Sequence, residues 1–269
     1  MSRSTGHKDP LFIIKVGGNV IDDAGQLDSF LTHFSGIGNR KILVHGGGKI
    51  ATSIGNRLNI PSKYIDGRRI TDDETIDLVT MVYGGLVNKR IVAQLQAKGC
   101  NALGVTGADA NLLPAKRRPV KDIDYGWVGD LNAQDIDVKN WKLLLDNDLT
   151  PVVASLTHDS SGHMLNTNAD TIASVIAVKL SSYYEVRLVF CFEKNGVLLD
   201  VEDERSVIER INYENYLSLK SSNRLFAGIL PKIDNAFDAI NKGVDEVIIG
   251  SSSHLSSLIK GTGGTKISL

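Results

Sequence analysis

The chain has 269 residues, of which 42% are hydrophobic and 23% are charged, and its formal net charge is −1 at pH 7. Such a composition is typical of a globular protein of one large or two small domains, and the near-zero charge gives no general affinity for nucleic acid or for an anionic membrane. No apolar run approaches the ~20 residues that a membrane-spanning helix needs, and residues 1–10 lack the apolar core of a signal peptide, so we expect a cytoplasmic protein.

The expected elements alternate between strands and helices along the chain. In order, we predict a strand at 11–16, a helix at about 26–36, a strand at 40–45 and a helix at 49–58. A capping box at 71–74 then begins a long helix that ends near 98–99, and a strand at 102–105 follows. There follow a helix at 135–148, a strand at 150–155, a helix at 169–180, a strand at 186–192, helices at 212–219 and 232–242, and strands at 245–249 and 266–269.

This alternation predicts a mainly parallel sheet with helices on both faces, which is a three-layer α/β sandwich. Turns at 111–133 and 158–165 predict β-hairpins that project from the sheet.

Two of the predicted strands run directly into glycines. Gly17 and Gly18 follow the first strand, in which Lys15 is the residue before last, and a run of three glycines that includes Gly47 and Gly48 follows the second. Glycine lets the backbone approach a ligand closely and turn its N–H groups toward an anion, and a helix that begins there adds the positive end of its dipole. The two turns together with the lysine therefore predict a site that handles phosphate.

The second turn resembles two common phosphate-binding motifs. A P-loop requires Ser or Thr after the lysine, but Ile50 follows Lys49. The dinucleotide-binding fingerprint fits residues 46–51 formally, with Asp66 about 20 residues further on. That acid should close a second long strand of the sheet, whereas residues 63–65 favour only a short strand or hairpin. A nicotinamide-dependent dehydrogenase therefore stays as an alternative.

Polar residues of the C-terminal half complete the candidate site. At a loop-to-helix junction, Asn168 is expected to cap the helix and Asp170 to complement its dipole. Neither role accounts for Asn166, which is therefore a candidate for binding a ligand. Lys232 is expected in the first turn of a later helix, where a cation opposes the helix dipole unless an anion is bound there.

Cysteine and histidine residues receive structural interpretations. Cys100 and Cys191 lie at or within predicted strands and are expected to be buried, reduced thiols, with a catalytic cysteine as the alternative. Neither has a second ligand at the spacing that a zinc site needs, and we predict no metal bound by the protein itself. His45, at a strand end, is expected to form structural hydrogen bonds.

Five segments together resemble the amino acid kinase family. They are Lys15-Val16-Gly17-Gly18-Asn19, His45-Gly46-Gly47-Gly48, Gly67-Arg68-Arg69-Ile70-Thr71, Asn166-Thr167-Asn168-Ala169-Asp170 and Gly228-Ile229-Leu230-Pro231-Lys232. The resemblance extends from residue 11 to residue 269, and the third and fourth segments point to the branch of the family that phosphorylates N-acylglutamates.

The resemblance implies the amino acid kinase fold and transfer of phosphate from ATP to the γ-carboxylate of an N-acyl-L-glutamate, N-acetyl or N-succinyl, in arginine biosynthesis. Mg²⁺ would accompany ATP and be held mainly by the nucleotide phosphates. A carboxylate with a pKa of ~4.3 is already ionised at neutral pH, so no general base is needed. The alternatives are a kinase for N-acyl-aminoadipate or a free amino acid, and an inactive ligand sensor on the same fold.

The resemblance also implies residue roles. Lys15 and Lys232 would neutralise the transferring phosphoryl group, and Asp170 would hold both lysines in place. Phosphate would be bound by Gly17 and Gly18, and the acylated amino acid by Gly47, Gly48, Arg69 and Asn166. The nucleotide would contact Glu193, Asn195, Gly196, Val197, Leu198 and Gly228. Near these residues Phe192 replaces the family's hydroxyl residue, and Lys194 replaces an apolar one.

The same resemblance implies two lobes in one continuous fold. Residues 1–180 would bind the acylated amino acid and form a homodimer, and residues 181–269 would bind the nucleotide. Relatives that arginine inhibits have an additional N-terminal helix that links dimers into a ring. Residues 1–10 contain glycine and proline and no apolar stripe, so we expect a homodimer that is insensitive to arginine.

Overall fold

The computed structural model describes residues 8–65, 67–200, 202–222, 225 and 229–269. Its centre is an eight-stranded sheet with the strand order β12-β14-β13-β11-β1-β2-β8-β5. Every neighbouring pair is parallel except β13 and β14, which confirms the prediction of a mainly parallel sheet. The strands are β1 (Pro10–Val16), β2 (Arg40–His45), β5 (Ala102–Val105), β8 (Thr150–Ala154), β11 (Glu185–Phe192), β12 (Arg210–Ile211), β13 (Glu246–Ser251) and β14 (Thr265–Ile267).

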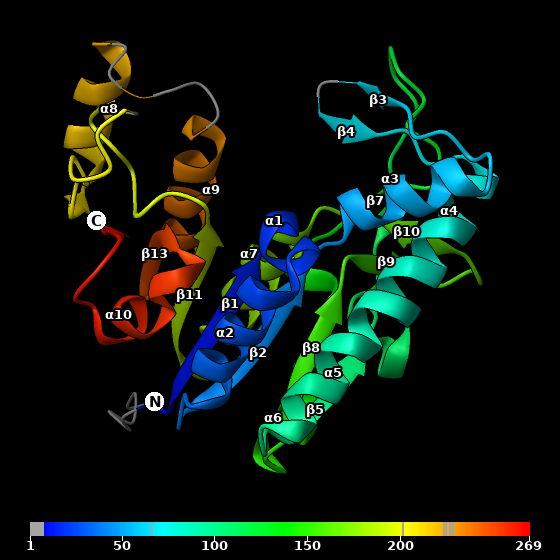
Figure 1. Cartoon of the computed structure of the whole chain (residues 1–269), viewed down its shortest axis with the longest axis horizontal. Coiled ribbons are helices and arrows are strands. Elements are labelled where there is room, and N and C mark those ends of the chain that lie inside the picture. Colours follow the sequence, from blue (N-terminus) through cyan, green and yellow to red (C-terminus); the bar gives the residue numbers. More distant parts are fainter. Residues whose placement is uncertain (1–7, 66, 201, 223–224, 226–228) are drawn as a thin grey trace, which may run out of the picture.

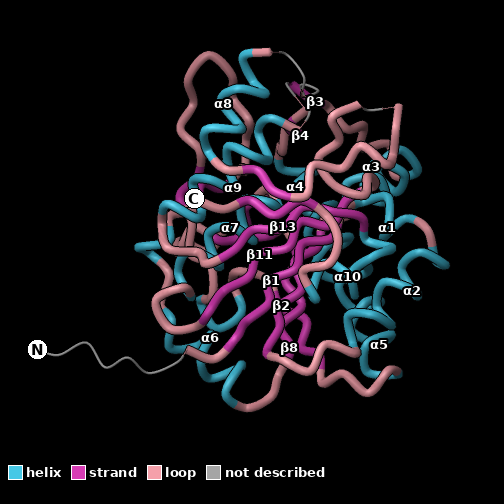
Figure 2. The backbone as a smooth tube through the Cα atoms, turned by 90° about the vertical axis from the view of Figure 1, so that its left-hand side faces the viewer, coloured by secondary structure: helices cyan, strands magenta, loops and turns pink. Residues whose placement is uncertain are grey.

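Helices cover both faces of this sheet, as Figure 2 shows with the magenta strands between two groups of cyan helices. One face packs against α6 (Val138–Asp146), α7 (Ala169–Leu180), α8 (Tyr213–Ser221) and α9 (Leu230–Asn241). The other packs against α1 (Gly18–Asp22), α2 (Ala24–Ser35), α3 (Gly48–Arg57), α4 (Asp73–Val79), α5 (Asn88–Ala97) and α10 (Leu255–Lys260). The chain is therefore the predicted three-layer α/β sandwich.

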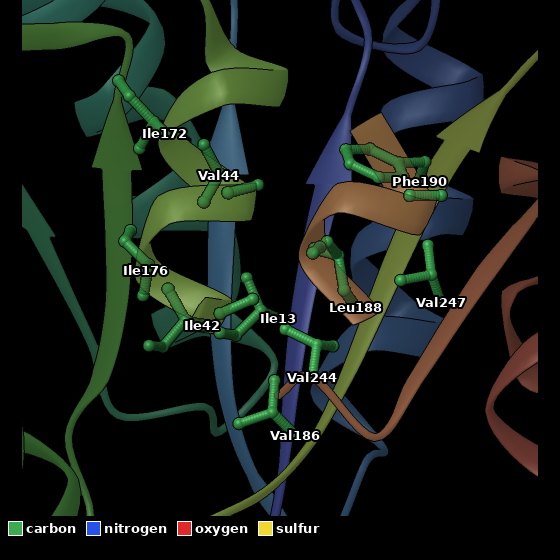
Figure 3. Packing of buried hydrophobic residues seen from close by; sticks show 14 of the residues in the cluster. Ile13, Ile42, Val44, Ile172, Ile176, Val186, Leu188, Phe190, Val244 and Val247 are labelled. Atoms are coloured by element: carbon green, nitrogen blue, oxygen red, sulfur yellow. The ribbon is translucent and has the colours of Figure 1, made fainter. Parts of the chain in front are cut away.

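The two layers of helices cover two separate hydrophobic cores, because successive side chains of a strand point to opposite faces. In β1, Leu11 and Ile13 enter one core, and Phe12 and Ile14 enter the other. Figure 3 shows Ile13 on the first face with α7 across it, and Ile172 of that helix is fully buried there. Burying one such side chain stabilises the fold by about 1.5–3 kcal/mol.

The predicted long helix of residues 71–98 is interrupted in its middle. A π-helical segment, Thr80–Val87, separates α4 from α5. The predicted capping box is wrong in its cap residue, because Asp72 rather than Thr71 accepts from the backbone N–H of Thr75, at 3.0 Å. The Thr71 hydroxyl instead donates to the carbonyl of Arg69 at 3.3 Å. A bridge to Gly126, which lies later in the chain, holds Thr71 in an extended conformation outside the helix.

Three hairpins project from the carboxyl end of the sheet, and two of them confirm the hairpins predicted at 111–133 and 158–165. They pair β3 (Tyr64–Ile65) with β4 (Arg68–Arg69), β6 (Lys116–Arg117) with β7 (Gly129–Asp130), and β9 (Leu156–His158) with β10 (Met164–Asn166). Figure 1 shows β3, β4, β7, β9 and β10 together at the upper right. Short 3₁₀ turns at Asp109–Asn111, Ala133–Asp135 and Ser252–His254 complete the described elements, and the sequence did not predict α1, α10 or β12.

The hairpin at residues 64–69 argues against the dinucleotide-binding alternative. Its first strand, β3, is two residues long and pairs only with β4 rather than joining the central sheet. Asp66, the acid that this alternative needs, lies outside the described residues. Among the helices that the structure describes, none has both the length and the apolar character that crossing a membrane requires.

Candidate active site

Three charged side chains from distant parts of the sequence meet at the carboxyl edge of the sheet. Lys15 lies near the end of β1, Asp170 is the second residue of α7, and Lys232 lies in the first turn of α9. The Nζ atom of Lys15 is 2.8 Å from Oδ1 of Asp170, and the Nζ atom of Lys232 is 2.9 Å from Oδ2. One carboxylate thus holds two ammonium groups, one on each oxygen.

The electrostatics of this trio leave an excess of positive charge. Burial alone would raise the pKa of Asp170, but the charges and hydrogen bonds of Lys15 and Lys232 outweigh burial and lower this pKa to about 2. Asp170 therefore stays ionised at neutral pH, and with so low a pKa its carboxylate is too weak a base to suit general-base catalysis. Two lysines and one aspartate sum to a charge of +1, which suits a group that transfers as a phosphoryl anion.

Local sequence explains why Asp170 points into the site. Asn168 caps α7, as predicted, and its Oδ1 accepts from the backbone N–H groups of Asp170 at 2.8 Å and Thr171 at 3.1 Å. This cap fixes the first turn of the helix, and the turn presents the carboxylate of Asp170 to the two lysines.

The two glycine turns lie side by side because β1 and β2 are parallel neighbours, with Val16 paired to His45. Gly17 precedes α1 and Gly47 precedes α3, so both turns begin helices at the same edge of the sheet as Lys15. A Cβ atom on Gly47 would lie 2.9 Å from the ring of Tyr83, which explains the glycine there on packing grounds. Gly18 and Gly48 are the first residues of their helices, where backbone N–H groups have no partner within the helix.

Arg69 is buried beside the start of α3. Its Nη2 atom donates to the carbonyl of Gly48 and to the hydroxyl of Thr52, both at 2.9 Å, and its Nη1 atom donates to the hydroxyl of Ser62. The guanidinium carbon also lies 4.9 Å from the centroid of the Tyr64 ring. Arg69 is thus fixed at the second glycine turn by four protein groups.

Asn166 is connected to Arg69 through one threonine. The side-chain amide of Asn166 donates to the hydroxyl of Thr71 at 3.0 Å, and that hydroxyl donates to the carbonyl of Arg69. Hydrogen bonds therefore connect Gly48, Arg69, Thr71 and Asn166 into one network next to the second glycine turn. A guanidinium group and a side-chain amide are groups that bind carboxylates.

Five of the six residues predicted to contact the nucleotide, at positions 193–198, directly follow β11 on the other half of the sheet. The side chains of Val197 and Leu198 are buried, and the backbone N–H of Val197 donates to the hydroxyl of Thr265 at 2.8 Å. The carbonyl of Val197 accepts from the backbone N–H of Ile208 at 2.8 Å, so both backbone groups of Val197 have protein partners. A Cβ atom on Gly196 would lie 2.6 Å from Val207, so this glycine is required by packing.

Other members of the predicted nucleotide set are placed differently. Glu193 is exposed, and Gly228 lies outside the described residues. Asn195 lines a cavity of about 590 Å³ together with residues of α10 and β14. Neither Lys15, Asp170 nor Lys232 lines this cavity, so it is separate from the charged trio.

The structural interpretations of cysteine and histidine agree with the geometry. Cys100 and Cys191 are buried and free, and burial raises the pKa of the Cys191 thiol to about 12, which argues against a catalytic thiolate. Burial lowers the pKa of His45 to about 4, and both of its ring nitrogens are hydrogen-bonded to protein groups. Within the described residues, no group of three or more His, Cys, Asp or Glu side chains is placed to hold a metal ion.

Sequence reasoning missed several residues of the site. Lys49, which follows the three glycines, donates to the side-chain oxygen of Asn19 and thereby connects the two glycine turns. A cation in the first turn of a helix was the available signal, as it was for Lys232. Thr52 and Ser62, which hold Arg69, carried no such signal, because hydroxyl residues are common on helices and in turns.

Comparisons with known proteins agree with this geometry. The model of the amino acid kinase family matches residues 10–251. Acetylglutamate kinase from Cytophaga hutchinsonii is 54% identical over 96% of this chain and 98% of its own, and that from Bacteroides fragilis is 50% identical over 97% of each. A solved structure of smu.665 from Streptococcus mutans superimposes with a TM-score of 0.76, at 27% identity, over 96% of this chain and 98% of that one.

Proposed function

This chain belongs to the amino acid kinase family, and we propose that it transfers the γ-phosphoryl group of ATP to the γ-carboxylate of N-acetyl-L-glutamate. The curated relatives at 50–54% identity are named acetylglutamate kinases, which supports this substrate and, with it, a place in arginine biosynthesis. The observation that carries the proposal is the trio of Lys15, Asp170 and Lys232 at the edge of the sheet next to two glycine turns.

In the proposed reaction, an oxygen of the γ-carboxylate attacks the γ-phosphorus atom of ATP, and the bond from that phosphorus to the bridging oxygen of ADP breaks. The products are an acyl phosphate and ADP. The attacking carboxylate is ionised at neutral pH, so the enzyme removes no proton. Its task is to bring two anions together and to neutralise charge as it moves. Lys15 and Lys232 would do this, while Asp170 holds both lysines in place.

The remaining residues divide the binding task. Gly17 and Gly18 would direct backbone N–H groups at the phosphates, and Gly47 and Gly48 would do so at the acylated amino acid. Arg69 and Asn166 would hold its α-carboxylate and acylamido group. This assignment is supported by the hydrogen bonds that connect Gly48, Arg69 and, through Thr71, Asn166.

The nucleotide would bind to the C-terminal half of the sheet, near residues 193–198 and the start of α9. Mg²⁺ would enter with ATP and be held mainly by the phosphates. Residues 1–180 and 181–269 contribute the two halves of the sheet, which meet where β1 pairs with β11, and we propose that these halves bind the acylated amino acid and the nucleotide respectively. The use of ATP is our reason for proposing a cytoplasmic location.

A homodimer through the N-terminal half is also part of the proposal. β5 is an edge strand of the sheet in the described structure, and its Leu103 side chain is 38% exposed. An exposed apolar side chain on an edge strand favours contact with a second chain.

The test is trapping of the acyl phosphate with hydroxylamine. Purified protein is incubated with ATP, Mg²⁺ and one of N-acetyl-L-glutamate, N-succinyl-L-glutamate, N-acetyl-L-aminoadipate, L-glutamate or L-aspartate, and the hydroxamate is measured. We expect the highest kcat/KM with N-acetyl-L-glutamate and no hydroxamate in the absence of Mg²⁺. Hydroxamate formed only from N-acetyl-L-aminoadipate or a free amino acid would show that the protein is a carboxylate kinase with a different substrate. No hydroxamate from any of these acids would indicate a ligand sensor.

A further inference from the structure

Tyr83 places a phenol group directly beneath the second glycine turn. It lies in the π-helical segment Thr80–Val87, and its side chain is buried. A Cβ atom on Gly47 would lie 2.9 Å from Cδ1 of this ring, and a Cβ atom on Gly48 would lie 4.0 Å from its hydroxyl oxygen. The ring therefore packs against the turn at Gly47, and the hydroxyl reaches toward the start of α3.

Packing within the π-helical segment does not explain why residue 83 carries a hydroxyl group. The π-helical segment is otherwise made of Thr80, two glycines and apolar residues, and a phenylalanine would fill the same space beneath Gly47. A tyrosine hydroxyl that is buried normally has a hydrogen-bonding partner. π-Helical segments frequently occur at functional sites, because the additional residue per turn changes where side chains point.

The nearest charged group identifies the chemistry of that partner. Burial raises the pKa of Tyr83, while the charge of the Arg69 guanidinium group and a hydrogen bond from that group to the phenol oxygen act in the opposite direction. The phenol is therefore protonated at neutral pH, and its oxygen accepts from Arg69 while its O–H can donate to a further group. The Nη1 and Nη2 atoms of Arg69 already bind Ser62, Thr52 and the carbonyl of Gly48. A carboxylate bound next to Arg69 therefore benefits from a second donor.

We propose that the Tyr83 hydroxyl donates a hydrogen bond to the α-carboxylate of the acylated amino acid, as the partner of Arg69 in selecting an α-carboxylate substrate. This inference rests on the proposed function and adds a residue that selects the substrate. The hydroxyl of Tyr83, and not its ring, discriminates between substrates with and without an α-carboxylate. The ring has the separate task of supporting Gly47.

The test compares Tyr83→Phe with the parent enzyme and with Tyr184→Phe. The control also removes a hydroxyl from a buried tyrosine, but Tyr184 contacts Asp146 near the opposite edge of the sheet. Steady-state kinetics are measured with N-acetyl-L-glutamate, with its α-amide N-acetyl-L-isoglutamine, and with ATP as the varied substrate, and the thermal midpoint of each protein is recorded.

For Tyr83→Phe we expect the KM for N-acetyl-L-glutamate to rise by roughly 10- to 100-fold, the range for losing a hydrogen bond to a charged group. The KM for ATP should be unchanged, and kcat should change by less than about 3-fold, because the α-carboxylate does not react. Discrimination between the acid and its α-amide should decrease, because a neutral amide loses less when the donor is removed. Tyr184→Phe should change none of these constants.

Three outcomes would overturn the proposal. An unchanged KM for N-acetyl-L-glutamate would show that only the ring of Tyr83 matters. A lower kcat at unchanged KM would assign the hydroxyl to the reacting γ-carboxylate instead. Equal losses with acid and amide would show that it does not contact the α-carboxylate. Failure of the proposed function is distinguishable, because the parent enzyme itself would then form no acyl phosphate.

Discussion

Asn88 donates a hydrogen bond from its side-chain amide to Nε2 of His45, with 3.0 Å between the two nitrogen atoms. The same amide nitrogen donates to the carbonyl of Val152 at 2.9 Å, which fixes the orientation of the amide. Nε2 of His45 must therefore accept, and its Nδ1 atom donates to the carbonyl of Gly46 at 2.8 Å. The imidazole is neutral in this arrangement, because a proton on Nε2 would face the donor of Asn88.

This relationship predicts a loss of stability in mild acid. Because burial lowers the pKa of His45 from 6.5 to about 4, the folded protein binds fewer protons than the unfolded chain between these values. The free energy of unfolding should therefore fall as the pH is lowered through this range, by about 2 kcal/mol between pH 7 and pH 5. Urea unfolding at the two pH values measures it. His45→Gln should remove most of this difference, and an equal loss in the variant would refute the assignment.

Replacement of either lysine of the trio should abolish most of the activity without unfolding the protein. Lys15→Ala or Lys232→Ala removes a positive charge from the position where negative charge moves, and we expect kcat to fall by roughly 10²–10³-fold. The acyl phosphate assay measures this, with circular dichroism to check folding. Lys242→Ala, on an exposed ion pair at the end of α9, is the control and should retain full activity. Near-normal turnover in either trio variant would contradict the mechanism.

Arg69→Lys should weaken binding of N-acetyl-L-glutamate without weakening binding of ATP. Lysine keeps the charge but cannot bind Ser62, Thr52 and Gly48 at once and still present a planar pair of donors to a carboxylate. We expect the KM for N-acetyl-L-glutamate to rise by about 10-fold or more while the KM for ATP stays within about 2-fold. Arg57→Lys, at the exposed end of α3, controls for the substitution itself. Equal increases in both KM values would assign Arg69 to the nucleotide or to structure alone.

The proposed homodimer is tested at the edge strand β5. A chain mass of 29.1 kDa predicts a light-scattering mass of twice that value at micromolar concentration. Leu103→Lys should shift this mass toward the monomer, because a charge would be buried in the contact between two chains. Leu143→Lys, at a residue of α6 that is 60% exposed, should leave the dimer intact. A parent protein that scatters as a monomer would rule out the dimer.

Local signals allowed much of the fold to be predicted. The apolar run that ends at Lys15, the glycines after it and the cap at Asn168 act over a few residues, so they determine strand, turn and helix wherever the chain places them. The strand at Glu185–Phe192 and the helix at Ala169–Leu180 accordingly agree with their predicted positions to within a residue. The candidate residues Lys15, Asp170 and Lys232 were likewise visible as lysines and an acid at glycine-marked or capped helix starts.

Contacts between distant segments decided the rest. Thr71 looked like a helix cap, but its pairing with the hairpin that contains Gly126 takes it out of the helix, and Asp72 caps instead. Tyr83 entered the site because the helix widens to a π-helix beneath Gly47, which no local pattern indicates. The sequence by itself determined which residues carry charge and where backbone turns occur. Only tertiary structure decided that Lys232 meets Asp170, which is 62 positions away in the sequence. The two residues meet because α7 and α9 pack against the same face of the sheet, in one hydrophobic core.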